Sequence, residues 1–266
     1  MTLQAGFLSD LTKGKTNSPY ISREDAVEIL GTMLGGYNIQ PLIDCLAIDG
    51  LADDAADALS NTLLIFDAFN DIFELSKNNI HAKRVIESWA NGEWFTNKSE
   101  VPETIKLTVF KVPGEINTDD LSPAPDAWSR PDIPLHALAM LKMPREGIEK
   151  PLETIEELKK KGNPLVFVGD VVGTGSSRKS ATNSVLWHMG DEIPAIPNKK
   201  EGGFCFGGKI APIFYNTLED SGAFPVECDV TKMEMGQEII FEPFNGKILD
   251  ASTNEVISEF NLKTDV

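Results

Sequence analysis

The sequence predicts a multi-domain protein, in which an all-α domain is followed by an α/β domain. Three observations support this division. Apolar residues first recur at helical spacing, the pattern changes to strand-like alternation at 105–111, and a β-branched apolar run at 165–168 leads into a glycine-rich loop. The 266 residues are enough for one large or two medium domains. We expect the two domains to cover 1–98 and 99–266.

Short helices separated by glycine and asparagine turns are predicted for the N-terminal domain. Ser22 and Asp25 form a near capping box in front of the first clear helix. The apolar face of that helix carries Ala26, Ile29, Leu30 and Met33. After a Gly-Gly break, Asn38 is expected to cap the next helix.

A longer helix is predicted over 52–68, and one or two further helices carry the apolar residues between Phe69 and Trp89. The apolar positions of the longer helix are Ala55, Leu59, Leu63 and Phe66. Short helices with brief turns are typical of a helical-repeat module and also of a small helical bundle. The residue pattern leaves both alternatives open.

In the α/β domain, the alternation at 105–111 predicts a strand with one buried face. The following segment to Pro134 is too rich in Pro, Asp and Ser for regular structure. Helices are expected at 135–142 and 152–161, and the run 165–168 is expected to be a buried strand. Near the C-terminus the residues are typical of strands, with a hairpin turn at 244–246 and a last strand at 256–262.

Composition and charge exclude several classes of protein. The net charge is −17, which disfavours binding to free nucleic acid because phosphate binding depends on Lys and Arg. No apolar run is long enough to span a membrane, and the start of the sequence does not match a signal peptide. We therefore expect a cytoplasmic protein without a membrane partner.

The cysteines and histidines predict no metal site. Cys45, Cys205 and Cys228 are widely spaced, so they match neither a zinc site nor an iron–sulfur site. The three histidines are scattered, and each is interpreted as a surface or packing residue: His81, His136 and His188.

The segment 169–178 is the first candidate for a binding site. Glycines at 169, 173 and 175 permit unusual backbone angles and a close approach to a ligand. Ser176, Ser177 and Arg178 then stand where a helix is predicted to begin. A helix N-terminus presents unpaired N–H groups and the positive end of the helix dipole, so this segment suits a carboxylate or a phosphate.

This loop has three other interpretations. A nucleotide P-loop requires a Lys-Ser/Thr pair after its last glycine, and that pair is absent. A hydrolase elbow requires glycine where Arg178 stands. The third interpretation is an ordinary strand-loop-helix turn with a serine cap, which this segment alone does not exclude.

A second stretch, Thr-Asp-Asp-Leu-Ser-Pro-Ala at 118–124 with Arg130 shortly after it, adds decisive information. Together with Gly-Thr-Gly-Ser-Ser-Arg at 173–178, it resembles the swivelling fourth domain of the bacterial B-type aconitases. The resemblance extends to 31–39 and 207–214 and so covers nearly the whole chain. It implies a HEAT-like helical domain followed by an aconitase swivel domain of β/β/α architecture.

The resemblance also implies an activity, the interconversion of citrate and isocitrate through cis-aconitate. It assigns the proton-abstracting base to Ser176, acting as an alkoxide, and an acidic site position to Asp119. It assigns substrate-carboxylate binding to Arg130, Ser177 and Arg178. Asp120 stands where other aconitases have histidine, a departure that fits the B branch. The resemblance leaves open whether a methylated relative, 2-methylisocitrate, is also a substrate.

Simple chemistry supports the same set of residues. An acidic protein that places two arginines in loops rich in Gly, Pro and Ser has the groups for a tricarboxylate half-site. Spacing alone does not bring the two loops together. The alternative is that Asp119 and Ser122 only stabilise their own loop through side-chain turns.

In the family, a [4Fe–4S] cluster and its cysteines lie on domains that follow this segment, so no cofactor is expected on this chain. We therefore expect an N-terminal portion of a B-type aconitase that is inactive without cluster-bearing domains, supplied in cis or in trans. The family's helical domain also begins earlier than this sequence, which would expose an apolar face and favour a homodimer. The alternative function is a stand-alone interaction or RNA-regulatory module, although the acidic charge argues against strong RNA binding.

Overall fold

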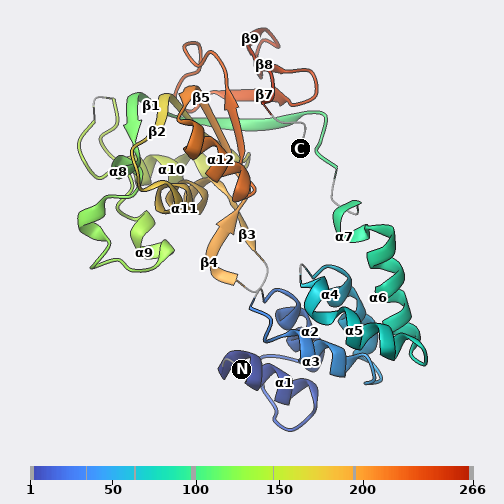
Figure 1. Ribbon diagram of the computed structural model, residues 1–266. Helices are drawn as coiled ribbons and strands as arrows, with labels where there is room; N and C mark the ends of the chain where they lie inside the picture. Colours follow the sequence, from blue (N-terminus) through green and yellow to red (C-terminus); the bar gives the residue numbers. More distant parts are fainter. Residues whose placement is uncertain are drawn as a thin grey trace. The chain divides into compact units, whose positions relative to one another are not determined.

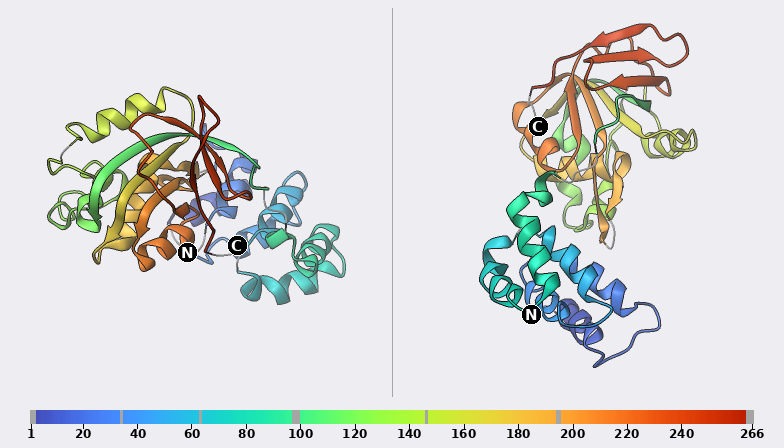
Figure 2. Two further views of the ribbon diagram at one scale, coloured as in Figure 1. Left: turned by 90° about the horizontal axis from the view of Figure 1, so that it is seen from above. Right: turned by 90° about the vertical axis from the view of Figure 1, so that its right-hand side faces the viewer.

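The computed structural model describes residues 3–33, 35–62, 64–96, 100–145, 147–193 and 196–263. The chain divides into two compact units, residues 1–100 and 101–266. In Figures 1 and 2 the first unit runs from blue to teal, and the second runs from green to red. Each unit is described separately below.

The first unit is helical in the part that the structure describes. Its helices are α1 (Leu3–Thr12), α2 (Arg23–Gly31), α3 (Ile39–Cys45), α4 (Ala52–Ser60), α5 (Ile65–Ser76), α6 (Ile80–Asn91) and α7 (Glu93–Thr96). Helices α1 to α6 contribute to one core, in which Leu30, Leu42 and Leu59 are completely buried. A Cβ on Gly31 would lie 2.9 Å from the Cβ of Ala58, so glycine allows α2 and α4 to pack closely.

The start of α2 confirms the predicted capping box. The Ser22 side chain accepts from the backbone N–H of Asp25 at 3.0 Å, and the Asp25 carboxylate accepts from the backbone N–H of Ser22 at 2.8 Å. The prediction for Asn38 was wrong. Its side chain makes no cap for α3, and its Nδ2 instead donates to the carbonyls of Leu30 and Met33 at the end of α2.

The predicted helix over 52–68 is interrupted and forms α4 and α5 instead. Asn61 Nδ2 donates to the carbonyl of Asp57, and Thr62 Oγ1 accepts from the backbone N–H of Leu64. Such local bonds compete with helix continuation. Phe66, expected on the apolar face, is 95% exposed on α5, and Leu63 lies outside the described residues.

The second unit combines a seven-stranded mixed sheet with helices and a small hairpin. Its strands are β1 (Ile105–Asn117), β2 (Leu165–Thr174), β3 (Asp191–Ile193), β4 (Ile196–Glu201), β5 (Phe204–Ile210), β6 (Phe224–Glu227), β7 (Glu238–Glu242), β8 (Lys247–Asp250) and β9 (Val256–Glu259). Its helices are α8 (Thr118–Leu121), the 3₁₀ turn η1 (Ala124–Asp126), α9 (Ile133–Ala137), α10 (Pro151–Lys159), α11 (Arg178–Met189) and α12 (Pro212–Asp220).

The large sheet has the order β6-β5-β2-β1-β7-β8-β9, with β3 and β4 forming a separate pair. Strands β1, β2, β5 and β6 are parallel, and β7, β8 and β9 continue from β1 as antiparallel strands. The hairpin predicted around residues 244–246 therefore connects β7 and β8. The long green strand in Figures 1 and 2 is β1, where the parallel part and the antiparallel part meet.

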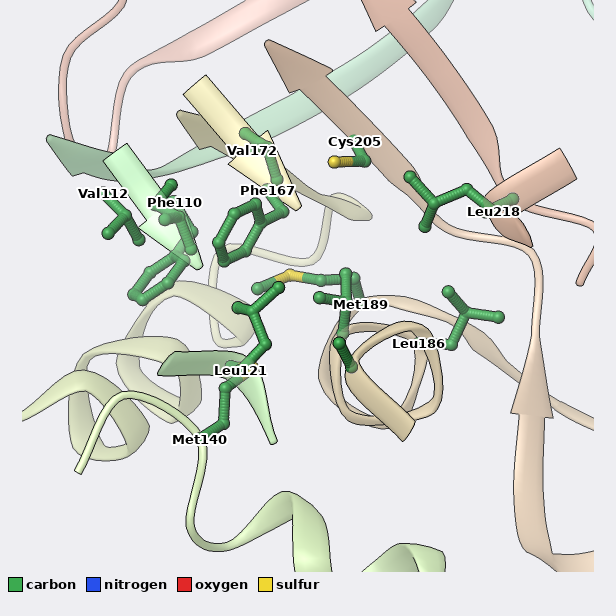
Figure 3. Packing of buried hydrophobic residues seen from close by; sticks show 14 of the residues in the cluster. Phe110, Val112, Leu121, Met140, Phe167, Val172, Leu186, Met189, Cys205 and Leu218 are labelled. Carbon is green, nitrogen blue, oxygen red and sulfur yellow. The ribbon is translucent and has the colours of Figure 1, made fainter. Parts of the chain in front are cut away.

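Both faces of the parallel strands are buried. On one face, Phe110 and Phe167 pack toward α11, as Figure 3 shows with Leu186 and Met189. On the other face lies a second core, which contains Val109 of β1, residues of β2 and β5, and residues of β7 and β8. The expectation that 105–111 buries only one face was therefore wrong. Because helices cover one face and the antiparallel part covers the other, apolar and polar residues need not alternate.

His188 on α11 predicts a pH-dependent stability. Its Nε2 lies 3.0 Å from the carbonyl oxygen of Ala137 and donates to it, and burial lowers the pKa of the imidazole. The unfolded chain binds the proton first as the pH falls below about 6.5, so the neutral histidine stabilises the fold above that value. We expect the free energy of unfolding to fall as the pH drops from about 6.5 through the folded pKa.

This pH dependence can be measured by chemical denaturation of wild type and His188→Gln at a series of pH values. Glutamine keeps a donor without a titrating ring, so the difference between the two proteins should shrink as the pH falls. A difference that is constant over this range would contradict the assignment.

Candidate functional site

The two candidate loops meet because they leave neighbouring parallel strands at the same edge. Ile116 on β1 is paired with Val172 on β2, and Asn117 is paired with Thr174. Thr174 Oγ1 also donates to the Glu115 carboxylate at 2.7 Å. The carboxyl ends of adjacent parallel strands are a common place for ligands in open α/β sheets.

Strand β2 is longer than the sequence predicted, because it continues through Gly169 and Gly173 to Thr174. These glycines were expected to lie in a loop. Gly173 instead allows the strand to pass the ring of Phe214 at its end, since a Cβ there would lie 2.2 Å from ring atoms. The loop proper begins at Gly175.

Gly175 provides the closest approach between the two loops. Its φ is +113°, and a Cβ there would lie 2.4 Å from Thr118 Oγ1 and 2.7 Å from Asn117 Oδ1. Two residues later, the backbone N–H of Ser177 donates to Thr118 Oγ1 at 3.2 Å. Thr118 is completely buried, so this bond fixes the loop before α11 against the start of α8.

A short helix, α8, stands in the segment that was expected to lack regular structure. The Asn117 side chain caps its N-terminus, and the Asp120 carboxylate accepts from the backbone N–H of Asn117 at 2.8 Å. The same carboxylate forms an ion pair with Arg145 Nη1 at 2.9 Å. Asp120 is therefore engaged in holding α8.

The start of α11 leaves its binding groups free. Ser177 occupies the N-cap position, but its side chain makes no capping hydrogen bond, so the structure does not contain the ordinary serine cap. Ser176 is exposed, and Arg178 is half-buried with no ion-pair partner among the described residues. Two hydroxyls and one guanidinium are thus adjacent in the chain at the N-terminus of a helix of 12 residues, which is the positive end of its dipole.

Arg130 lies opposite α11 in a loop that its own contacts stabilise. Its Nη1 donates to the carbonyl of Leu135 at 3.1 Å, and its Nε lies 3.7 Å from Asp126 Oδ1. The Lys142 ammonium binds the other oxygen of Asp126 and holds the pKa of that carboxyl below its usual range. Asp126 is therefore held in its charged form next to Arg130 Nε.

Arg130 and Ser177 line one cavity of about 380 Å³. Most of its other polar lining comes from the loop after α8 and from one face of α11: Ser122, Asp132, His136, Ser180, Asn183 and Ser184. Ser176, Arg178 and Asp119 lie outside this lining. The structure thus brings Arg130 together with Ser177, while Ser176 and Arg178 adjoin the cavity along the chain.

Asp119 is exposed, and its carboxylate has no hydrogen-bond or ion-pair partner in the described part of the chain. Its backbone N–H donates to Asn117 Oδ1 at 2.9 Å. The side chain is therefore not needed to hold its own loop, which was the alternative considered for it. Asn117 and Asp120 perform that task.

Sequence reasoning missed two side chains at this site. His136 lines the cavity and contacts both Ser122 and the backbone of Arg130. Arg145 neutralises Asp120 from a distant part of the sequence. The only available signal was the Asn117–Asp120 spacing of a capping box, which identifies neither residue.

No metal centre is apparent in the ranges that the structure describes, where no three His, Cys, Asp or Glu side chains gather as ligands would. Burial raises the pKa of Cys205 to about 12 and that of Cys228 to about 11, which disfavours the thiolate that binds metals. Among the described helices, none combines the length and apolar character that a membrane span requires.

Comparison with known families identifies the chain. The sequence model described as "Aconitate hydratase 2 N-terminus" matches residues 107–266, and the one described as "Aconitate B N-terminal domain" matches residues 2–95. The chain belongs to the aconitate hydratase B family. Aconitate hydratase B of Pseudomonas aeruginosa is 61% identical, that of Escherichia coli 59%, and that of Helicobacter pylori 51%, each over 99% of this chain.

The chain spans only 31% of the length of the Pseudomonas and Escherichia aconitate hydratases and 30% of the Helicobacter protein, so it corresponds to an N-terminal portion of them. A solved structure of a 3-isopropylmalate dehydratase from Methanocaldococcus jannaschii covers 60% of this chain and 83% of its own. Its TM-score is 0.43 at 20% identity, a likeness too weak to support an argument.

Proposed function

We propose that this chain is the part of an aconitate hydratase that contributes the serine base and half of the tricarboxylate-binding site. The reaction would interconvert citrate and isocitrate through cis-aconitate. The observation that carries the proposal is the junction of the two loops, where Thr118 accepts from Ser177 and Arg130 shares a cavity with Ser177. Sequence spacing alone could not predict that these two loops meet.

Each proposed side chain has a chemical task that its surroundings support. Arg130 and Arg178 would bind substrate carboxylates, where a guanidinium fork gives orientation as well as charge. Ser177 would donate a further hydrogen bond to a carboxylate. These contacts would hold the substrate with a carbon-bound hydrogen facing Ser176, because positioning supplies a large part of the rate.

Ser176 would then accept the proton as its alkoxide. A serine hydroxyl is a weak acid, so its anion must be stabilised for it to act as a base. Support comes from the sequence position of Ser176, which precedes the N-terminus of α11 and lies two residues before Arg178, a residue without an ion-pair partner in the described part of the chain. Asp119 is proposed as an acidic group of the site, because its side chain is exposed and can contact substrate or another domain.

The described residues do not suit an iron–sulfur cluster, because the three cysteines are buried and no group of three or more potential ligands gathers among them. We therefore assign no step of the reaction to a cluster on this chain. A [4Fe–4S] cluster would belong to further aconitase domains, and the isolated chain is proposed to be inactive in turnover. The choice between citrate and 2-methylisocitrate as substrate depends on those domains too.

Finer features that the family resemblance implies stay predictions. These are the HEAT-like character of the first unit, the swivel motion of the second, a homodimer through the helices, and a cytoplasmic location. RNA binding by this acidic chain alone is not expected, given its net charge of −17.

Citrate binding tests the half-site directly, since this chain is expected to bind citrate without converting it. We expect Arg130→Gln and Arg178→Gln each to weaken citrate binding by about 1.5–3 kcal/mol, the usual value of a hydrogen bond to a charged group. Isothermal titration calorimetry with the 266-residue chain measures this. Arg84→Gln is the matched control, because Arg84 pairs with Asp53 and Asp57 in the helical unit.

Two outcomes would contradict the proposal. The first is wild-type affinity for citrate in both arginine variants. The second is an affinity for acetate equal to that for citrate, since a half-site for a tricarboxylate must engage more than one carboxylate.

A further inference from the structure

His136 links two parts of the proposed site through its two ring nitrogens. Its Nε2 lies 2.8 Å from Ser122 Oγ, and its Nδ1 lies 3.2 Å from the backbone carbonyl oxygen of Arg130. A carbonyl only accepts, so Nδ1 carries hydrogen and donates to it. In that tautomer of the neutral ring, Nε2 accepts from the Ser122 hydroxyl.

The Ser122 side of this link leads to the loop before α11. Ser122 is only 2% exposed, and its backbone N–H donates to the carbonyl of Thr118 at 2.8 Å. Thr118 in turn accepts from the backbone N–H of Ser177 through its side chain. Hydrogen bonds therefore run from His136 through α8 to the start of α11.

The Arg130 side of this link belongs to a largely exposed loop, although the ion pair of Asp126 with Lys142 also ties it to the chain after α9. Most residues between η1 and α9 are exposed, including Trp128 at 96%. Arg130 itself bonds to Asp126 and Leu135, which lie in the same segment between η1 and α9 or at its two ends. They shape the loop but do not anchor it to α8. A loop with so few buried contacts needs a specific anchor to stay in one position.

We propose that His136 is a positioning residue, which sets the location of the Arg130 guanidinium relative to Ser177 by tying the Arg130 backbone to Ser122. The inference rests on the proposed function insofar as Arg130 binds a substrate carboxylate. The histidine itself need not touch the substrate. Its effect on binding follows from geometry, since a displaced guanidinium loses hydrogen bonds to the carboxylate, which weakens the affinity by roughly 10- to 100-fold.

Three variants of the 266-residue chain test this inference. His136→Ala removes both bonds. His136→Asn keeps an amide nitrogen near the position of Nδ1, so it can still donate to Arg130. His188→Asn is the matched control, because His188 binds the carbonyl of Ala137 on the same helix α9 but does not contact Arg130 or Ser122.

The first measurement is the dissociation constant for citrate by calorimetry, with thermal unfolding recorded for every variant. We expect His136→Ala to bind citrate about 10- to 100-fold more weakly and His136→Asn to recover most of the affinity. His188→Asn should lower the unfolding temperature and leave the affinity unchanged. Wild-type affinity in His136→Ala, or an equal loss in His188→Asn, would overturn the inference.

The second measurement separates this inference from the proposed function. The NMR resonance of the Arg130 Nε–H group reports the position of the guanidinium beside Asp126 without any ligand. It should shift or broaden in His136→Ala and stay in place in His188→Asn. If wild type fails to bind citrate, the proposed function fails, and this resonance alone decides the positioning role. An unchanged resonance in His136→Ala would then refute that role.

Discussion

Ser176→Ala is expected to reduce aconitate hydratase turnover by about 10²–10⁴-fold, the usual contribution of a general base. The chain must first be joined to the remaining domains of a family member, such as the Pseudomonas aeruginosa enzyme, because it spans only 31% of that protein. Ser176 is exposed and lies directly before the uncapped start of α11. Loss of its hydroxyl should therefore remove the proton acceptor without disturbing the packing.

Formation of cis-aconitate from citrate, followed by ultraviolet absorbance, measures the rate. The kcat should fall while KM changes little, since carboxylate binding is assigned to the arginines and to Ser177. Ser221→Ala is a matched control, because Ser221 lies at the end of α12 and its hydroxyl donates to the carbonyl of Thr217, away from the proposed site. An assembled Ser176→Ala enzyme with wild-type kcat would remove Ser176 from the mechanism.

Gly173→Ala is expected to destabilise the α/β unit by about 2–5 kcal/mol, from two contributions. A left-handed φ of +80° costs a non-glycine residue about 1–2 kcal/mol. The added Cβ would also lie 2.2 Å from the ring of Phe214, which is completely buried, and overpacking costs about 1–3 kcal/mol more. Gly173 lies two residues before Gly175, where the loop that carries Ser176 begins. A shift of the backbone at Gly173 should therefore also displace that loop.

Gly162→Ala separates the two contributions. Gly162 has a φ of +84°, almost the same as that of Gly173, but a Cβ there would meet no atom within 4 Å. Chemical denaturation should show a loss of about 1–2 kcal/mol for Gly162→Ala, from the backbone alone. Equal losses in the two variants would show that the contact with Phe214 contributes nothing.

The sequence was sufficient for the features that depend on neighbouring residues. It predicted a helical region followed by an α/β region, the capping box of Ser22 and Asp25, and the hairpin between β7 and β8. The family was also predicted correctly, because several motifs occurred in the expected order. Local chemistry and motif order are both directly readable in a sequence.

The errors came from contacts between different elements of structure, which the pattern within one element does not show. Asn38 was expected to cap the helix after it, but it binds carbonyls of the helix before it. The strand at 105–111 was expected to bury one face, but both of its faces are buried because a core lies on each side of it. The β3–β4 hairpin was not anticipated, since its short strands carry no strong apolar pattern. In the first two cases tertiary packing overrode the local signal, and in the third the local signal was absent.

The candidate site shows the same limit. Motif similarity identified Ser176, Ser177, Arg178, Asp119 and Arg130, whose roles stay proposals. It did not reveal that Gly175 presses against Asn117 and Thr118, nor that His136 connects Ser122 to Arg130. The first contact joins segments that the pairing of β1 with β2 brings together, and the second depends on how the chain folds back between these two strands.

The position of β1 between the two parts of the sheet has a consequence for the order of folding. Its parallel partner β2 follows after α10, whereas its antiparallel partner β7 comes only after all of α11, α12 and β6. Closing the shorter loop costs less conformational entropy, so the pairing that assembles the candidate site can form before the sheet is complete. The antiparallel strands β7, β8 and β9 would then pair with β1 late in folding. Their docking would bury the second core and complete the native structure around strands that are already paired.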